Sequence, residues 1–418
     1  MPSHTAYKQR GLRAFLRHNL RWIAGGFVLT YFSSFGQTYF VAASVAHWQA
    51  AFGLSHGEFG RLYMFATLGS ALCLPFLGRV VDAAPPHRVI LFVMTVLAAA
   101  ALLAGFASSL PVLFGAVFLL RLFGQGMMTH VALTATGRWF AADRGRAVSL
   151  VVLGHQGGEA SIPLAFAALT LAYGHRVGWL AAALALLAIG LPCAWWCYRT
   201  PRKPDAAGER GHQTRVPSRD WTRREVLRDP IFWVILSGVL GPAFIGTTVF
   251  YHQNYMTTLQ GWPARFFADT LVVMAATTVV CALGAGALVD RFSARALLPW
   301  FLLPLGAACF VLAASGPAEA LYLVMVLIGI SYGMSSTLFG ALWPEIYGVA
   351  NLGAIRAVAV ATMVLATAAG PGLTGSLIDV GFSLPEQMVY LGGYCLLAAA
   401  AMTLAGRVLQ RRAASIGG

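Results

Sequence analysis

Charged side chains are scarce in this sequence: they make up 11% of the 418 residues, whereas 58% are hydrophobic and the mean hydropathy is +0.70. In an average soluble chain about a quarter of the residues are charged. The composition therefore argues against two or three soluble domains and predicts one polytopic membrane protein.

Sequence motifs of common enzymes are also missing. There is no P-loop, no HExxH, no GxSxG and no GxGxxG that follows a strand, which argues against catalysis and against ATP-driven pumping by this chain alone. The six cysteines lie within hydrophobic runs, at no spacing typical of zinc ligands or of a disulfide framework. His155 and Glu159 would offer a metal only two ligands. We expect no enzyme activity, no cofactor and no metal site.

Acidic residues are few as well, with 15 Asp and Glu against 29 Lys and Arg, for a net charge of +14. In a soluble protein this charge would suggest a nucleic-acid partner. Here the basic residues lie between apolar runs, a pattern that fits membrane topology better. We therefore expect contact with the lipid bilayer and none with nucleic acid.

Apolar runs of about 20 residues, bounded by charges or by Pro and Gly turns, predict twelve membrane-spanning helices. The predicted spans are residues 22–46, 58–80, 88–107, 110–136, 146–171, 177–198, 231–257, 266–288, 296–315, 319–342, 354–378 and 387–406. The fold class is therefore an all-α membrane protein.

Lys and Arg concentrate in the tails and in the loops that share a side with the N-terminus. Only Arg61, Arg176 and Arg265 lie on the other side, and Arg121 falls inside a span. The positive-inside rule therefore predicts that both termini are cytoplasmic, and we expect the plasma (inner) membrane. The first apolar run is too long for a cleaved signal peptide.

One long polar segment, residues 199–230, divides the chain and is rich in Arg, Pro and Asp. It predicts a cytoplasmic linker, within which residues 221–228 could form a short interfacial helix or stay disordered. The expected organisation is a cytoplasmic tail (1–21), a six-helix bundle (22–198), the linker, a second six-helix bundle (231–406) and a cytoplasmic tail (407–418).

An internal repeat supports this division. The GRVVD sequence from Gly78 to Asp82 recurs as GALVD from Gly286 to Asp290, 208 residues later. Arg146-Ala-Val recurs at Arg356, and a Gly-Met pair recurs at a similar offset. Three matches in the same order indicate a duplicated six-span unit, which predicts two pseudo-symmetric six-helix bundles.

These repeats resemble the loop motif G-x-x-x-D-R/K-x-G-R/K of the major facilitator superfamily of secondary transporters, over essentially the whole chain. The second copy continues with Arg291 and is a reasonable match, whereas the first has its basic residue displaced. A carboxylate beside such a glycine can pair with an arginine and latch one conformation. The latch residues that we expect are Gly78, Asp82, Gly286, Asp290, Arg291, Arg146 and Arg356; solvated loop charges are the alternative.

The second half resembles the oxalate/formate and monocarboxylate transporter-like branch of that superfamily. The residues that carry this likeness are LRDPIFW from Leu227, WPEIYG from Trp343, and Gly370, Pro371, Gly375 and Asp379. Span 4 carries Arg121 in a sequence similar to the R-x-x-q-G-x-g motif of proton-coupled members, with the order of Gln and Gly exchanged. The resemblance implies alternating access by a monomer around a central site.

Ionisable residues are rare at mid-depth and are costly there unless they are paired or solvated. Arg121 and Glu159 both fall near mid-depth; Gln125 shares a face with Arg121, and His155 and Gln156 share one with Glu159. One interpretation is that Arg121 and Gln125 bind an anion while Glu159 and His155 take up a proton. The other is a structural Arg121–Glu159 ion pair.

Polar stripes on other spans add substrate-binding candidates, of which we retain Gln37, Tyr251 and Tyr332. The second half has no charge at mid-depth, which argues against a dianion held by two cations. The sequence thus predicts proton-coupled symport of a small organic anion, a monocarboxylate. The alternatives are proton-driven efflux of amphipathic or drug-like compounds and, in another class, a membrane sensor that does not transport.

Overall fold

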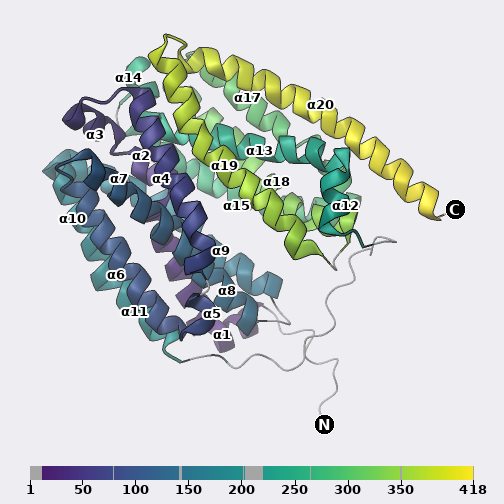
Figure 1. The fold of residues 1–418 in the computed structure, drawn as a ribbon, viewed down its shortest axis with the longest axis horizontal. Helices are drawn as coiled ribbons and strands as arrows, with labels where there is room; N and C mark the ends of the chain where they lie inside the picture. The colour runs from purple at the N-terminus through teal and green to yellow at the C-terminus, as the bar shows by residue number, and fades with distance from the viewer. Residues whose placement is uncertain are drawn as a thin grey trace. The chain divides into compact units, whose positions relative to one another are not determined.

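The computed structural model describes residues 12–78, 80–140, 144–200, 202, 220–263, 265–348 and 351–417, and every regular element in these ranges is a helix. The chain forms two compact units (Figure 1). Unit 1 comprises residues 1–37, 69–162 and 169–211, and unit 2 comprises residues 38–68, 163–168 and 212–418.

Unit 1 is built around α6 (Pro86–Gly105), which packs against α7 (Leu110–Leu119), α10 (His175–Ala185) and α11 (Leu191–Tyr198). Gly105 permits close packing here, since a Cβ at this position would lie 2.6 Å from Cβ of Trp179. The unit also contains the elements α1 (Leu12–Phe32), the 3₁₀ turn η1 (Ser33–Gly36), α5 (Val80–Ala83), the π-helical turns η2 (Leu120–Met128) and η3 (Leu186–Gly190), α8 (Thr129–Trp139) and most of α9 (Arg144–Tyr173).

Unit 2 contains the elements α2 (Thr38–Ala42), α3 (Val45–Phe52), the first part of α4 (His56–Leu77), α12 (Arg223–Arg228), α13 (Pro230–Tyr251), α14 (Gln253–Leu259), α15 (Phe266–Phe292), α16 (Ala294–Leu297), α17 (Leu302–Ala313), α18 (Ala320–Tyr347), α19 (Leu352–Asp379) and α20 (Leu384–Gly417). Its core is formed by the pairs α15 with α18, α17 with α20, and α13 with α19. In Figure 1 the long α20 runs beside α17 toward the C-terminus.

The predicted spans coincide with helices. Within the described residues, nine helices are long and apolar enough to cross a membrane. Two of the other predicted spans fall on α4 and α9, which are 22 and 30 residues long. At ~1.5 Å per residue α4 and α9 each reach the ~30 Å of a hydrocarbon core. The first, residues 22–46, begins in the 21-residue α1 and continues through η1 and α2 into α3, so its helix is interrupted. The prediction of an all-α membrane fold is confirmed.

Within the predicted linker, the short helix suggested for residues 221–228 is present as α12. Its first turn carries a capping box, because the Thr222 side chain accepts from the backbone N–H of Glu225 while Glu225 accepts from the N–H of Thr222. Trp221 attaches this segment to the end of α18 through a 3.0 Å hydrogen bond from its N–H to the carbonyl of Tyr347. The chain that leads into α13 is therefore already helical and is attached to α18.

Candidate functional site

Arg121 lies in η2, the π-helical turn of the fourth predicted span, and only 2% of its surface is exposed. Its Nη1 donates a 3.1 Å hydrogen bond to the carbonyl oxygen of Gly36. That carbonyl ends η1, where the first span is interrupted before Gln37. Because π-helical turns are frequent at functional sites, a buried guanidinium in such a turn marks this region of unit 1 as the leading candidate site.

The approach of η1 to η2 requires glycine on both sides. A Cβ on Gly124 would lie 2.6 Å from the Cα of Gly36, and a Cβ on Gly36 would lie 2.6 Å from the backbone nitrogen of Gln125. Gln37 and Gln125 are both half-buried. Arg121 and Gln125, two of the predicted substrate-binding residues, therefore lie together on η2. A third, Gln37, directly follows Gly36, on which η2 packs.

Glu159 lies on α9, which packs closely against α1. A Cβ on Gly154 would clash with the carbonyl of Phe27, and one on Gly158 would clash with the Ser34 hydroxyl. Such spacing of small residues brings membrane helices into backbone contact. This packing leaves Glu159 only 4% exposed, so a carboxyl group is held inside the bundle.

The carboxyl group of Glu159 has no hydrogen bond or ion pair with any residue in the described part of the chain, Arg121 included. The structural ion pair that we considered is therefore absent from this conformation. On the same face of α9, His155 is half-buried, and Oε1 of Gln156 is buried without a hydrogen-bond partner among the described residues. Glu159, His155 and Gln156 thus form a polar stripe along α9.

Tyr251 and Tyr332, the candidates in the second half, both belong to unit 2. Tyr251 is 1% exposed, its ring lies 5.1 Å from that of Tyr63, and its hydroxyl has no hydrogen-bond partner among the described residues. The Tyr332 hydroxyl donates to the carbonyl of Pro242 at 3.1 Å. The Tyr63 hydroxyl bonds to Thr38 Oγ1 at 2.7 Å. Sequence reasoning missed Tyr63, because a tyrosine in an apolar helix gives no signal of its neighbours.

Part of the predicted latch lies outside the described residues, because the side chains of Asp82, Asp290 and Arg146 are not described. Arg356 and Arg291 are exposed, and the Arg291 guanidinium lies 5.1 Å from the centre of the Phe292 ring. Gly78 directly follows α4, and Gly286 lies within α15. The proposed pairs of these arginines with the two aspartates remain predictions.

In unit 2 an ion pair between Arg295 and Glu345 joins α16 to α18. Arg295 Nε donates to Glu345 Oε1 at 2.7 Å, and the backbone N–H of Ala294 donates to Glu345 Oε2 at 2.9 Å. Arg295 is the last basic residue of the second loop motif, and Glu345 belongs to the WPEIYG segment. Each motif is visible in the sequence, but no feature of the sequence indicates that the two motifs meet.

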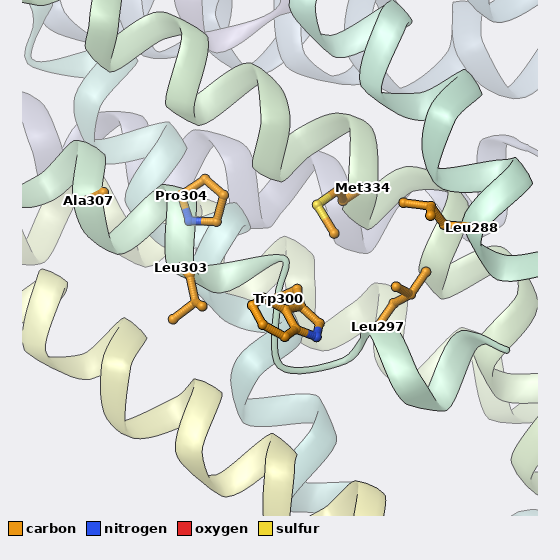
Figure 2. A pocket seen from close by; sticks show the side chains of 7 residues that line it. All are labelled: Leu288, Leu297, Trp300, Leu303, Pro304, Ala307 and Met334. Carbon is orange, nitrogen blue, oxygen red and sulfur yellow. The ribbon is translucent and has the colours of Figure 1, made fainter. Parts of the chain in front are cut away.

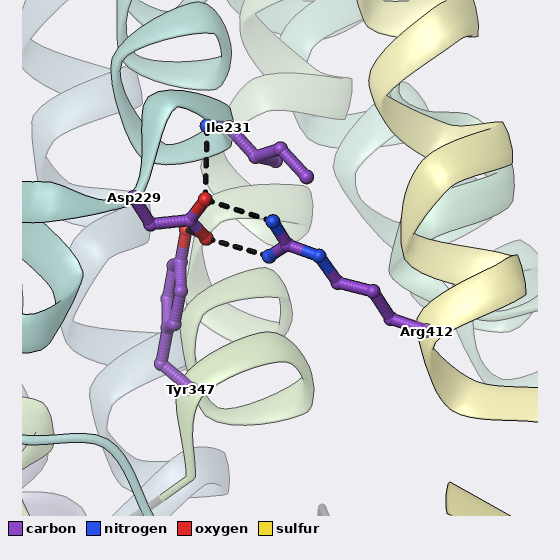
Figure 3. A network of polar contacts seen from close by, with 4 residues as sticks. All are labelled: Asp229, Ile231, Tyr347 and Arg412. Atoms are coloured by element: carbon purple, nitrogen blue, oxygen red, sulfur yellow. Dashed lines mark hydrogen bonds and ion pairs between the residues drawn. The ribbon is translucent and has the colours of Figure 1, made fainter. Parts of the chain in front are cut away.

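Asp229 forms a second network nearby (Figure 3). Its carboxylate accepts two hydrogen bonds from Arg412, at 2.8 and 3.1 Å, one from the Tyr347 hydroxyl at 3.1 Å and one from the N–H of Ile231 at 3.2 Å. Hydrogen bonding to Asp229 raises the pKa of Arg412 above its usual value. The N-terminus of α13, the end of α18 and the last turns of α20 are thereby joined. We call this region, with Arg295 and Glu345, the linker end of unit 2.

An open groove of about 600 Å³ lies among α15, α16, α17 and α18 (Figure 2). Its lining residues are Leu288, Leu297, Trp300, Leu303, Pro304, Ala307 and Met334. Specific ligand sites combine an apolar lining with a few polar groups that fix orientation. This lining offers only the indole N–H of Trp300, so the groove is unsuited to binding a charged solute.

Helices of membrane-spanning length and buried polar stripes define a multi-pass α-helical membrane protein. Residues 27–371 match the sequence family described as the Major Facilitator Superfamily. The chain belongs to this superfamily, and it is a secondary transporter rather than an enzyme. The comparison with curated proteins found no match.

Solved structures share the fold. A bacterial homologue of the human lysosomal transporter Spinster, in an inward-facing and unoccupied conformation, is similar at a TM-score of 0.70 and 17% identity, over 93% of this chain and 97% of that chain. A variant of the nucleoside transporter NupG is similar at a TM-score of 0.68 and 14% identity, over 93% of this chain and 99% of that chain. The expected superfamily is confirmed, whereas the narrower oxalate/formate and monocarboxylate branch remains a prediction.

Proposed function

We propose that this transporter moves a small organic anion, a monocarboxylate, together with protons across the plasma membrane, with both termini in the cytoplasm. The observation that carries the proposal is the buried cation Arg121, held in the π-helical turn η2 against the interrupted first span. A charge at this depth is costly and is retained where it has a function. A guanidinium presents paired N–H donors that match the two oxygens of a carboxylate.

Glu159 supports the proton-coupled part of the proposal. The carboxyl group is buried and has no cationic partner among the described residues. Ionising it there would leave an uncompensated charge, whereas a carboxyl group that carries a proton is neutral. Glu159 would therefore bind a proton in one conformation and release it when water reaches α9 in the other. His155, one turn away, would relay that proton.

The first test measures the anion site. Wild-type protein and Arg121→Ala are reconstituted in proteoliposomes, and uptake of a panel of labelled small carboxylates is measured with an inward proton gradient. We expect uptake to fall about 10- to 100-fold in Arg121→Ala, the size expected when a charged hydrogen-bond partner of the substrate is removed. Arg121→Lys should restore only part of it, because lysine lacks the paired donors.

Arg224→Ala is the matched control, since Arg224 is exposed on α12. It should transport like the wild type. Equal uptake by Arg121→Ala would refute the assigned role. If the wild type takes up none of the carboxylates, efflux of amphipathic compounds is favoured instead. If it binds a ligand but does not transport it, a sensor is favoured.

The second test measures proton coupling at Glu159. Because glutamine keeps the shape of the side chain but cannot take up a proton, Glu159→Gln should abolish gradient-driven accumulation while counterflow exchange of the same anion persists. Uptake is measured from pH 5.5 to 8.0, where the wild type should lose rate as the pH rises and the variant should show a flat profile. Glu319→Gln is the control, because Glu319 is exposed at the start of α18. An unchanged profile in Glu159→Gln would exclude this residue as the proton site.

A further inference from the structure

The groove in Figure 2 lies beside a break in a membrane-spanning segment of unit 2. α16 ends at Leu297 and α17 begins at Leu302, with a turn between them. The Ser331 hydroxyl on α18 donates to the carbonyl of Phe301 at 2.7 Å, which fixes this turn against α18. Phe301 is 0% exposed, whereas the preceding Trp300 is 59% exposed and lines the groove. The break therefore turns one aromatic side chain inward and its neighbour outward.

The groove has the depth of one leaflet of a bilayer. Its lining begins with Leu288 and Leu297, which lie near the ends of the spans Phe266–Val289 and Ala294–Ala313. It continues to Ala307, which at ~1.5 Å per residue lies about 15 Å further along the chain than Leu297. The hydrocarbon core of a bilayer is ~30 Å thick. The groove therefore runs from the edge of this core to about its middle.

The groove opens toward lipid. Leu303, Ala307 and Phe310 fall on one face of α17, at i, i+4 and i+7, and all three are exposed. A continuous exposed apolar face on a membrane-spanning helix marks the surface that contacts the acyl chains. Leu303 and Ala307 also line the groove, whose lining side chains carry one polar group, the indole N–H of Trp300. An acyl chain suits this lining because it has no polar group to leave unsatisfied.

A cation lies next to the shallow end of the groove. Arg291 follows Leu288 by one turn of α15, so the two share a face of that helix. Its guanidinium is exposed, lies 5.1 Å from the centre of the Phe292 ring, and has no carboxylate partner among the described residues. The carboxylate of Glu345 is already paired with Arg295. Since arginine matches the geometry of a phosphate, this end of the groove is suited to an anionic headgroup.

We propose that this groove is a binding site for one anionic phospholipid of the leaflet at the linker end of unit 2. One acyl chain lies along the lining from Leu297 to Ala307, and Arg291 binds the phosphate. Trp300 lies between them, at the headgroup level that tryptophan prefers. We call this site the lipid groove. The bound lipid joins α15 to α17 beside the break, and the inference is independent of the transported solute and of the coupling ion.

The site is tested by photochemical labelling of the full-length protein. Wild type and Arg291→Ala are reconstituted in phosphatidylcholine vesicles with a trace of phosphatidylglycerol that carries a diazirine in its acyl chain, and labelled peptides are identified by mass spectrometry. We expect label within residues 297–307 and at Met334. Unlabelled phosphatidylglycerol should remove it by competition, whereas added phosphatidylcholine should not. Arg291→Ala should lower this labelling about fivefold, because one arginine near a bilayer surface contributes about that much attraction to anionic lipid.

Matched variants make the result specific. Arg224→Ala removes an exposed arginine of α12 and should label like the wild type. Ala307→Trp fills the groove from an exposed position on α17 and should abolish the label, although Arg291 is intact. Ala400→Trp, at an exposed position on α20 outside the groove lining, should label like the wild type.

Thermal unfolding in detergent separates loss of lipid binding from damage to the fold. Without added lipid, all four variants should melt like the wild type. Added phosphatidylglycerol should raise the melting temperature of the wild type, Arg224→Ala and Ala400→Trp, since a ligand that binds the folded state stabilises it. It should raise that of Arg291→Ala and Ala307→Trp much less.

Label at the expected positions that is reduced in Arg291→Ala and lost in Ala307→Trp would establish the lipid groove. Equal competition by phosphatidylcholine, or full labelling of Arg291→Ala, would overturn the anionic headgroup and with it the inference. Label spread evenly over all exposed helices would identify bulk lipid only and would overturn it too. Protein–protein cross-links at α17 in place of lipid label would assign the groove to a second copy of the chain and would also overturn it.

Discussion

At the scale of single residues, Asp229 has the most extensive hydrogen bonding of the described carboxylates. It is 4% exposed and accepts four hydrogen bonds, two of them from a guanidinium. A buried charge contributes little net stability when it is paired, but removing one partner leaves the others unsatisfied. The network therefore acts as a junction among α13, α18 and α20 that is sensitive to loss of any member.

We predict that Asp229→Ala lowers the free energy of unfolding by about 2–4 kcal/mol, since it leaves the Tyr347 hydroxyl and the guanidinium without their acceptor. Arg412→Ala should cost less, because its side chain is 39% exposed and water can replace part of the pair. Arg407→Ala, an exposed arginine on the same helix, is the control and should be neutral. Equal stability of Asp229→Ala and the wild type in denaturant titrations would contradict the role of the network.

The sequence identified Arg121 and Glu159 because a charge in a long apolar run stands out against its surroundings. Their depth and faces followed from helix geometry, but their partners did not. The carbonyl of Gly36 carries no sequence signal as an acceptor for Arg121, since every residue has such a group. Arg295 and Glu345 were visible as members of two motifs, yet their contact depends on the packing of α16 against α18.

At the scale of elements, hydropathy located the spans well because the bilayer imposes a length on each apolar helix. The interruption at Ser33–Gly36 and the π-helical turn at Leu120–Met128 were not predicted. Both lie inside apolar runs. They pack against each other at the contact of Gly36 with Gly124, so the shape of each depends on the other. A local sequence cannot indicate a distortion whose cause is a second helix.

The packing of α9 on α1 gives a prediction at this scale. Gly158→Ala should destabilise the protein by about 1–3 kcal/mol, because a methyl group has no room beside Ser34 and the helices must move apart. Gly157→Ala is the matched control on the same helix: its Cβ would lie 3.5 Å from the Tyr31 ring, an ordinary contact. Thermal unfolding should show a lower melting temperature for Gly158→Ala than for Gly157→Ala. A similar loss of stability in both variants would show that helix propensity rather than packing determines the effect.

At the scale of the whole molecule, the superfamily could be predicted from sequence because its loop motifs recur in order along a duplicated chain. Which segments of the chain belong to which compact unit could not be predicted. Residues 38–68 precede the linker by more than a hundred positions, yet they pack with α13, α14 and α19. Hydropathy records which residues avoid water, and it contains no information on which ends of the helices meet.

The close contact between α4 and α19, where a Cβ on Gly60 would clash with the carbonyl oxygen of Pro371, also creates a composite surface. Ser55 and Arg61 lie beside Ser376 and Asp379, although more than three hundred residues separate them along the chain. An antibody fragment that recognises all four side chains together would find its epitope intact only while these helices touch. Since a binder shifts an equilibrium toward the state that it prefers, such a fragment would arrest the transporter in the joined state and act as an inhibitor without occupying the solute site.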